Sequence, residues 1–151
     1  MSPQLGFHSL HDEATASIGV EGSLPPWLTG SLLRTGPGAF SMPGGSTVEH
    51  WFDGLAMCYR FTFDPGDRAG ATGAADAVHY RNRFLRTDAY DEATNGQFDG
   101  GFATGETTLR SRLAGFLTAP YDNTNIIAER IGDAYLALTE SPRKVRFDPS
   151  T

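Results

Sequence analysis

The chain of 151 residues carries a net charge of −6 and has a pI near 5.1, which excludes a broad basic surface that would attract nucleic acid. Hydrophobic residues make up 39% of it, enough for the core of one domain, but no apolar run approaches the roughly 20 residues of a membrane-spanning helix. The single cysteine, Cys58, excludes an internal disulfide, and the first residues lack the basic and apolar regions of a secretion signal. We therefore expect a cytoplasmic protein.

Glycine and proline, with 18 and nine residues, predict many short strands and turns, and hence an all-β protein. The first predicted strand, Gly30 to Thr35, is expected to follow a turn at residues 25–26 and to end in a second turn at residues 36–38. The next, Leu55 to Phe63, alternates large apolar residues with smaller or polar ones, as in a strand with two distinct faces. Val78 to Thr87 is its predicted return strand in a hairpin with a long loop.

The chain between residues 88 and 108 is polar and glycine-rich and shows no periodicity. Residues 109–117 then predict one amphipathic helix, because apolar residues recur there at the spacing of a single helix face. These apolar residues are Leu109, Leu113, Phe116 and Leu117. The helix either lies in a membrane interface or packs on the protein as an ordinary surface helix, and the residues favour neither interpretation.

Three short strands joined by tight turns are predicted in the last part of the chain: Asn125 to Arg130, Ala134 to Glu140 and Val145 to Phe147. Strands connected this closely are typical of the blade of a β-propeller. The sequence stops just after the third strand without a closing element, so we expect the fold to be incomplete in these 151 residues.

Histidines are the first candidates for a metal site, because imidazole is the commonest metal-binding side chain. His8 and His11 lie near the N-terminus without a third ligand close in sequence, and His79 occupies the outward phase of its strand. We interpret all four histidines, His50 included, as surface or structural residues. Cys58 lies in mid-strand without a histidine or cysteine partner, so we interpret it as a buried structural thiol rather than a nucleophile.

Six segments with distinctive sequences follow one another along the chain. They are GSLPPWLTGSLLRTGPGAF (residues 22–40), HWFDGLAM (50–57), YRNRFLRTDAY (80–90), DNTNI (122–126), ALTE (137–140) and FDP (147–149). In this order they resemble the N-terminal part of the carotenoid cleavage oxygenases. Since the resemblance covers nearly all of residues 22–151, we divide the chain into an N-terminal segment, 1–21, and a propeller portion, 22–151.

The resemblance implies a seven-bladed β-propeller, of which this chain forms only the first blades. It also implies an Fe(II) ion on the propeller axis, held by four histidines from different blades. With O2, such enzymes split a conjugated double bond of a carotenoid or apocarotenoid, and some relatives instead isomerise and hydrolyse retinyl esters. None of the histidines here matches a ligand position, so we expect all four ligands beyond Thr151 and no iron bound by this chain alone.

The same resemblance implies two roles near the predicted active site. Glu140 is expected to accept a hydrogen bond from an iron-bound histidine, which would orient that imidazole, and Thr139 is expected to line the cavity. For other motif residues we expect structural roles: Trp27 packs the N-terminal strand against a sheet, and Arg34 forms a buried ion pair with Asp53.

Relatives take apolar substrates from membranes, so the resemblance makes the apolar face of residues 109–117 a candidate for a peripheral membrane contact, and a helix packed on the propeller stays the equal alternative. Two other functions stay open. The first is a truncated, inactive propeller fragment or interaction module. The second is part of a different propeller, one that binds a sugar or peptide and never held iron. In each case we expect no catalysis by these 151 residues alone.

Overall fold

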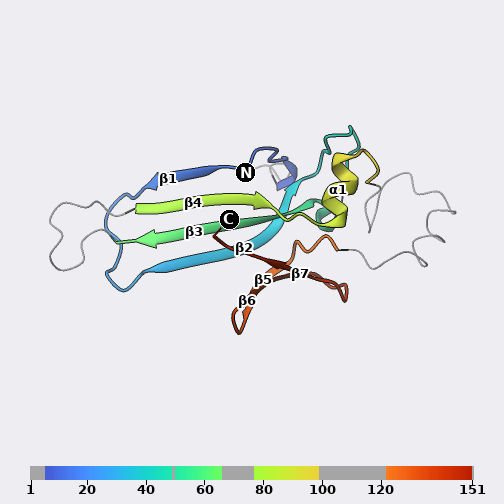
Figure 1. The fold of residues 1–151 in the computed structure, drawn as a ribbon. Coiled ribbons are helices and arrows are strands. Elements are labelled where there is room, and N and C mark those ends of the chain that lie inside the picture. The colour runs from blue at the N-terminus through green and yellow to red at the C-terminus, as the bar shows by residue number, and fades with distance from the viewer. Residues whose placement is uncertain (1–5, 49, 66–76, 99–121, 151) are drawn as a thin grey trace.

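Two antiparallel sheets make up the computed structural model, which describes residues 6–48, 50–65, 77–98 and 122–150 (Figure 1). The first sheet has the order β1–β4–β3–β2, with β1 at Thr15–Gly19, β2 at Gly30–Ala39, β3 at Leu55–Asp64 and β4 at Ala77–Phe84. The second has the order β5–β6–β7, with β5 at Ile127–Ile131, β6 at Ala134–Leu138 and β7 at Lys144–Phe147. The predicted all-β architecture is confirmed, and the one α-helix among the described residues, α1 (Asp88–Thr94), is short and lies at the end of the first sheet.

Strand β3 is buried on both faces where it begins, and this links the two sheets. Leu55 and Met57 point into a core formed with β2, β4 and α1, whereas Ala56 and Cys58 point towards the second sheet. The predicted alternation of β3 is therefore confirmed, but both faces are apolar at this end. The first core contains Ala39, Phe40, Met42, Val48, Leu55, Met57, Phe84, Ala89, Ala93 and Phe98, and the second contains Ala56, Cys58, Leu85 and Ala137 with Val145 and Phe147 beside them.

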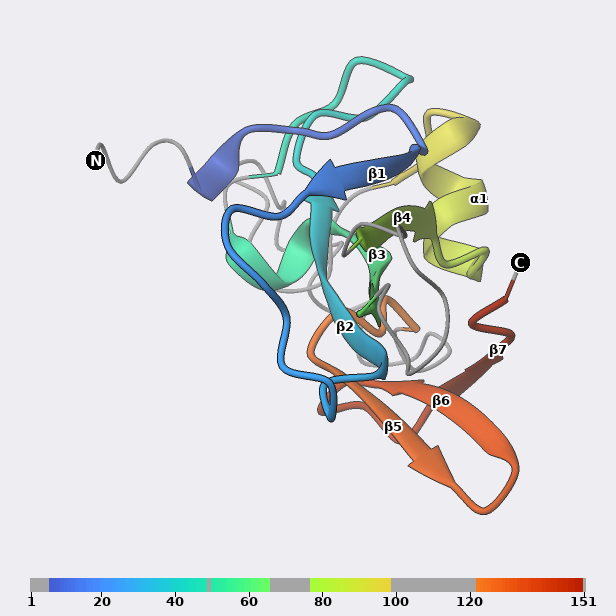
Figure 2. The same cartoon turned by 90° about the vertical axis from the view of Figure 1, so that its left-hand side faces the viewer.

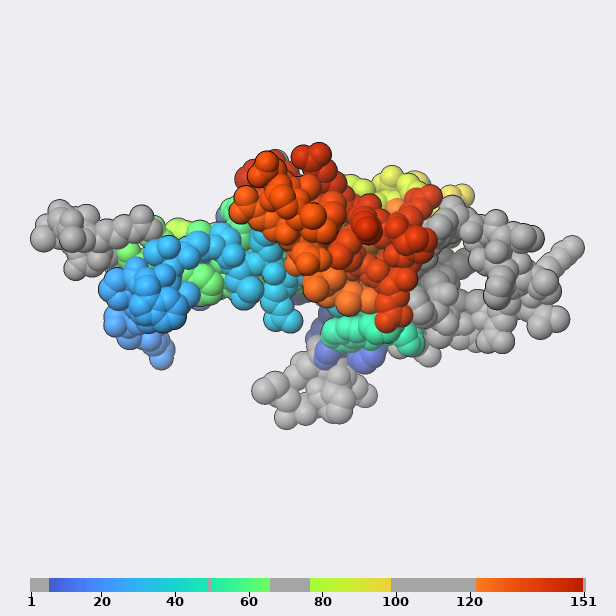
Figure 3. Space-filling model, turned by 90° about the horizontal axis from the view of Figure 1, so that it is seen from below, coloured from blue at the N-terminus to red at the C-terminus, as the bar shows by residue number. Residues whose placement is uncertain are grey.

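The second sheet lies across one face of the first. Figure 1 and Figure 2 both show β5 and β6 below β2, and β2 and β5 are in contact. Figure 3 shows the orange and red residues of this sheet covering the middle of the molecule. Ala137, on the face of β6 that points inward, is completely buried, and a larger side chain there would push the sheets apart.

Strand β2 does not end where the sequence predicts a turn. The prediction of a turn at residues 36–38 is wrong: β2 continues to Ala39, and a register shift between Pro37 and Ala39 marks a bulge. A Cβ atom at Gly38 would lie only 2.8 Å from the Cβ of Met57. Glycine is therefore required here by the close approach of β3 and not by a chain reversal.

Two predicted packing roles in the first motifs are wrong. Trp27 is 78% exposed, because it lies in the turn before β2, where Leu28 N–H donates to Pro25 O at 2.9 Å. Arg34 is exposed on the edge strand β2 while Asp53 is fully buried, and no ion pair joins these two described residues.

Several predicted boundaries shift. The return strand β4 ends at Phe84, because Thr87 already caps α1, a helix that the sequence does not predict, since it lies in a segment without periodicity. The predicted strand from Ala134 to Glu140 ends at Leu138. The predicted amphipathic helix of residues 109–117 lies outside the described residues, and none of the described helices is long and apolar enough to cross a membrane.

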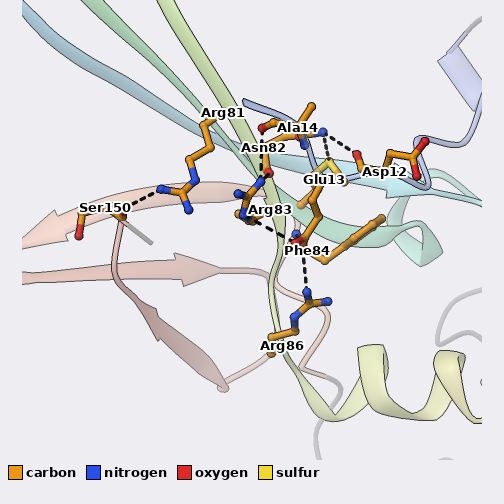
Figure 4. A network of polar contacts seen from close by, with 10 residues as sticks. Asp12, Glu13, Ala14, Arg81, Asn82, Arg83, Phe84, Arg86 and Ser150 are labelled. Carbon is orange, nitrogen blue, oxygen red and sulfur yellow. Dashed lines mark hydrogen bonds and ion pairs between the residues drawn. The ribbon is translucent and has the colours of Figure 1, made fainter. Parts of the chain in front are cut away.

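The segment before Gly22, for which the sequence offers no role, contributes an edge strand to the first sheet. Strand β1 pairs antiparallel with β4, and polar contacts extend this pairing towards the N-terminus (Figure 4). The Glu13 carboxylate accepts from Phe84 N–H and from the Arg86 guanidinium, each at 2.9 Å, and lies 3.7 Å from Arg83 Nε. Asn82 accepts from Ala14 N–H and is itself buried.

We predict that Gly38→Ala lowers the free energy of unfolding by about 1–3 kcal/mol, because the added methyl group overlaps Met57. Gly36→Ala is the matched control, since its Cβ would meet Tyr59 at 3.7 Å, an ordinary contact, and we expect a change within about 1 kcal/mol. Urea unfolding of both variants measures the difference. Equal stability of the two variants would contradict the bulge packing.

Candidate functional site

The loop after β6 carries both residues that the sequence assigns to the active site. Strand β6 ends at Leu138, whose carbonyl accepts from Ile126 N–H at 3.2 Å. Thr139 is half-buried and Glu140 is exposed. The Glu140 carboxylate forms no hydrogen bond or ion pair with any residue in the part of the chain that the structure describes. The structure therefore brings Thr139 and Glu140 to one strand end, and their roles stay predictions.

Arg143 ties the far end of this loop to the first sheet. Its Nη1 lies 2.7 Å from Asp88 Oδ2 and 3.8 Å from Asp122 Oδ2. Its backbone N–H donates to Ser141 Oγ at 3.3 Å, which closes a tight turn between Glu140 and β7. The loop is thus held by β6 on one side and by charged groups of other elements on the other.

The buried Asp122 carboxylate completes the N-terminus of α1. It accepts from the backbone N–H groups of Asp88 and Ala89 at 2.8 and 3.1 Å. Thr87 is the N-cap, and its hydroxyl accepts from Tyr90 N–H at 3.1 Å. These bonds satisfy three of the N–H groups that a helix leaves unpaired in its first turn.

Asn123 and Asn125 connect the DNTN and FDG motifs through the backbone. The Asn123 side chain accepts from Ala56 N–H at 2.7 Å and donates to Gly54 O at 2.8 Å and to Phe52 O at 3.2 Å. Asn125 donates to the same two carbonyls, each at 2.9 Å. Both asparagines are almost fully buried, so these bonds replace water at groups that would otherwise be costly to bury.

The FDG motif forms a turn at the start of β3. Residues Trp51–Asp53 form a 3₁₀ helix, capped by His50, whose Nδ1 accepts from Phe52 N–H at 3.3 Å. A Cβ atom at Gly54 would lie 2.6 Å from the Cβ of Pro37, so the glycine lets this turn pack directly on β2. The FDG turn is therefore in direct contact with β2 and with the segment that contains Asn123 and Asn125.

A cleft of about 240 Å³ between β4 and β7 was not predicted. Arg60 Nη1 donates there to Pro149 O and Arg81 Nη1 to Ser150 O, both at 2.6 Å, and Figure 4 shows the second of these bonds. The sequence carries a signal for this cleft: Arg81 and Arg83 are two residues apart on a strand, so their side chains share a face. Five arginines line the cleft: Arg60, Arg81, Arg83, Arg86 and Arg146.

Three of the four histidines have ordinary polar partners, His50 as the cap described above, and His8 is exposed. His11 Nε2 lies 3.2 Å from Ser41 Oγ, and the exposed His79 has its Nδ1 3.2 Å from Ser17 Oγ. Within the described ranges, no three histidine, cysteine, aspartate or glutamate side chains converge as metal ligands would. The described residues therefore do not fit an iron site on their own.

Cys58 is a buried thiol, as predicted, and its side chain packs in the core between the two sheets. Burial raises its pKa from 9.0 to about 11, and the nearby Arg60 only partly offsets this. At neutral pH the thiol is therefore protonated and a poor nucleophile.

Comparison with solved structures defines the class of fold. Two mutant forms of the Synechocystis apocarotenoid oxygenase superpose with TM-scores of 0.76 and 0.77, at 28% and 30% sequence identity. In each case the match covers 97% of this chain and 29% of the oxygenase chain. The two antiparallel sheets thus match part of the β-propeller fold of that enzyme.

Residues 7–151 match the family model of the retinal pigment epithelial membrane protein, and the chain belongs to this family, the carotenoid cleavage oxygenases. It is 34% identical over 147 residues to the β,β-carotene 15,15'-dioxygenase of Gallus gallus, which covers 87% of this chain and 25% of that protein. It is 35% identical over 148 residues to the mitochondrial carotenoid-cleaving dioxygenase of Pongo abelii, which covers 89% of this chain and 25% of that protein. The chain thus spans about a quarter of the length of these relatives. The predicted family is confirmed, and the comparisons do not favour the alternative of an inactive fragment or interaction module.

We predict that Cys58 reacts slowly with a thiol reagent in the native protein. A pKa of about 11 instead of 9.0 lowers the thiolate fraction at neutral pH about 100-fold, and burial slows access further. Because the folded pKa is raised, the associated stability is present below pH 9 and is lost as pH rises towards 11. Labelling with Ellman's reagent, against the urea-unfolded chain as control, measures the rate. Equal rates in both states would refute this account of Cys58.

Proposed function

We propose that this chain is the N-terminal part of an Fe(II)-dependent oxygenase that uses O2 to cleave a conjugated double bond of a carotenoid or apocarotenoid in the cytoplasm. The observation that carries the proposal is the match of 97% of the chain to the Synechocystis apocarotenoid oxygenase with a TM-score of 0.76. The relatives from Gallus gallus and Pongo abelii are both carotenoid dioxygenases, which supports the same substrate class.

In this proposal the two sheets belong to the first blades of a seven-bladed propeller. In each sheet three consecutive strands, β2–β3–β4 and β5–β6–β7, pair antiparallel with their neighbours in sequence, which is the usual construction of a blade. The open edges of β1, β2, β5 and β7 are consistent with a fold that continues, because unpaired strand edges otherwise promote association.

The proposed iron is held by four histidines located beyond Thr151. One of the matching structures is a cobalt-substituted form of the Synechocystis enzyme, which supports a metal site in the complete fold. The contribution of this chain is Glu140, whose carboxylate accepts a hydrogen bond from one of those histidines, and Thr139, which lines the cavity. The exposed position of Glu140 at a strand end leaves its carboxylate accessible to such a partner.

The test is to express the reading frame that contains this chain together with the sequence that follows Thr151, to load it with Fe(II), and to assay cleavage of apocarotenoids and carotenoids under O2. We expect two carbonyl products from the complete protein and none from residues 1–151 alone. Absence of product from the iron-loaded complete protein, or a downstream sequence without four dispersed histidines, would overturn the proposal.

We predict that Glu140→Gln in the complete protein lowers iron affinity or turnover by about 10–100-fold, because a neutral amide accepts the histidine N–H bond more weakly. Glu129→Gln is the matched control, since Glu129 is an exposed carboxylate on β5 of the same sheet. Iron content per protein and kcat are measured for both. Identical behaviour of the two variants would remove Glu140 from the site.

A further inference from the structure

Arg143 joins the loop that carries Glu140 to two carboxylates from other elements. Asp88 opens α1, and Asp122 begins the buried segment that precedes β5. The Arg143 guanidinium lies 2.7 Å from the first and 3.8 Å from the second. Arg143, three residues after Glu140, is thus held by the two carboxylates at the N-terminus of α1.

The two carboxylates differ in how strongly they hold the arginine. The Asp88 side chain is 74% exposed, and an ion pair that water surrounds is worth little. The Asp122 side chain is only 10% exposed and already accepts two backbone N–H groups, so its charge is poorly screened and fixed in place. Asp122 is therefore the stronger anchor, although its contact with Arg143 is the longer one.

The neighbouring bonds make this anchor stiff. Asp122 is followed directly by Asn123, whose side chain is bonded to residues 54 and 56, so Asp122 does not move independently of the first sheet. On the loop side, the bond from Arg143 N–H to Ser141 Oγ leaves only a tight turn between the guanidinium and Glu140. Displacement of Arg143 is therefore transmitted to Glu140 over a short, constrained stretch of backbone.

We propose that Arg143 is a positioning residue for Glu140: by binding Asp122 and Asp88 it fixes the loop of residues 139–143 and with it the direction of the Glu140 carboxylate. This inference rests on the proposed function, in which Glu140 accepts a hydrogen bond from a metal-binding histidine. A site of this kind needs its groups held to within about 0.5 Å, which a loop without an anchor does not provide.

The test uses the complete protein and a double-mutant cycle. We expect Arg143→Ala to lower kcat about 10-fold with KM changed less than about twofold, because the arginine does not contact substrate, and Arg143→Lys to restore most of the loss. In the Glu140→Gln background, Arg143→Ala is expected to have no further effect on kcat, since both changes act through the same carboxylate. The same loss in both backgrounds, or no loss in either, would overturn the inference.

Arg130→Ala is the matched control, because Arg130 lies 3.8 Å from Asp133 at the opposite end of β6, where both side chains are exposed. It is expected to leave kcat unchanged. Hydrogen exchange gives a readout that does not depend on turnover: in Arg143→Ala the backbone amide of residue 143, which donates to Ser141 Oγ, is expected to exchange about 10-fold faster, with β6 unchanged. A wild-type protein without turnover refutes the proposed function, whereas unchanged exchange in Arg143→Ala refutes the anchor itself.

Discussion

The hydrogen bonds between the Asn123 side chain and the backbone of residues 52–56 join the two sheets of this chain. One amide accepts from Ala56 N–H and donates to two carbonyls of the FDG turn, about 70 residues earlier in the sequence. Asn123 is fully buried, and each backbone group left without a partner there would cost about 1–3 kcal/mol. The bonds therefore contribute to stability mainly because the fold would otherwise bury backbone groups that have no hydrogen-bond partner.

Much of the surrounding structure depends on this connection. Fixing residues 54–56 against Asn123 sets the start of β3, where one face packs on Phe40 and the other on Ala137. The same segment carries Asp122, which caps α1 and faces Arg143. A single buried polar segment thus supports the cores on both sides of β3 and the anchor of the loop that carries Glu140.

The sequence predicts those features that depend on neighbouring residues. The alternation of β3, the tight turn between β5 and β6, and the burial of Cys58 follow from local patterns and are confirmed. The turn at residues 36–38 was wrong because Gly38 is required by Met57, a contact between strands. Trp27 was misplaced because an aromatic residue in a family motif does not reveal whether it faces the core of this chain or its surface.

Helix α1 was missed because seven residues are too few to establish a helical period, although Thr87 followed by Asp88 is a recognisable N-terminal signal. The candidate site is only partly predictable for a different reason. The ALTE motif identifies Glu140 through resemblance, but the role of Arg143 depends on two carboxylates 21 or more residues earlier, which no local pattern reveals. Within the described residues no three potential metal-binding side chains converge, and the four histidine ligands stay a prediction.

The most direct test of the central connection is hydrogen exchange in Asn123→Ala, compared with Asn95→Ala, an exposed asparagine at the end of α1. If residues 122–125 hold the two sheets together, amides in β3 and in β5–β7 should both exchange at least about 10-fold faster in Asn123→Ala, since the lost bonds exceed about 1.4 kcal/mol. The control should leave both sheets unchanged. Faster exchange confined to residues 122–125, with both sheets still protected, would contradict the account.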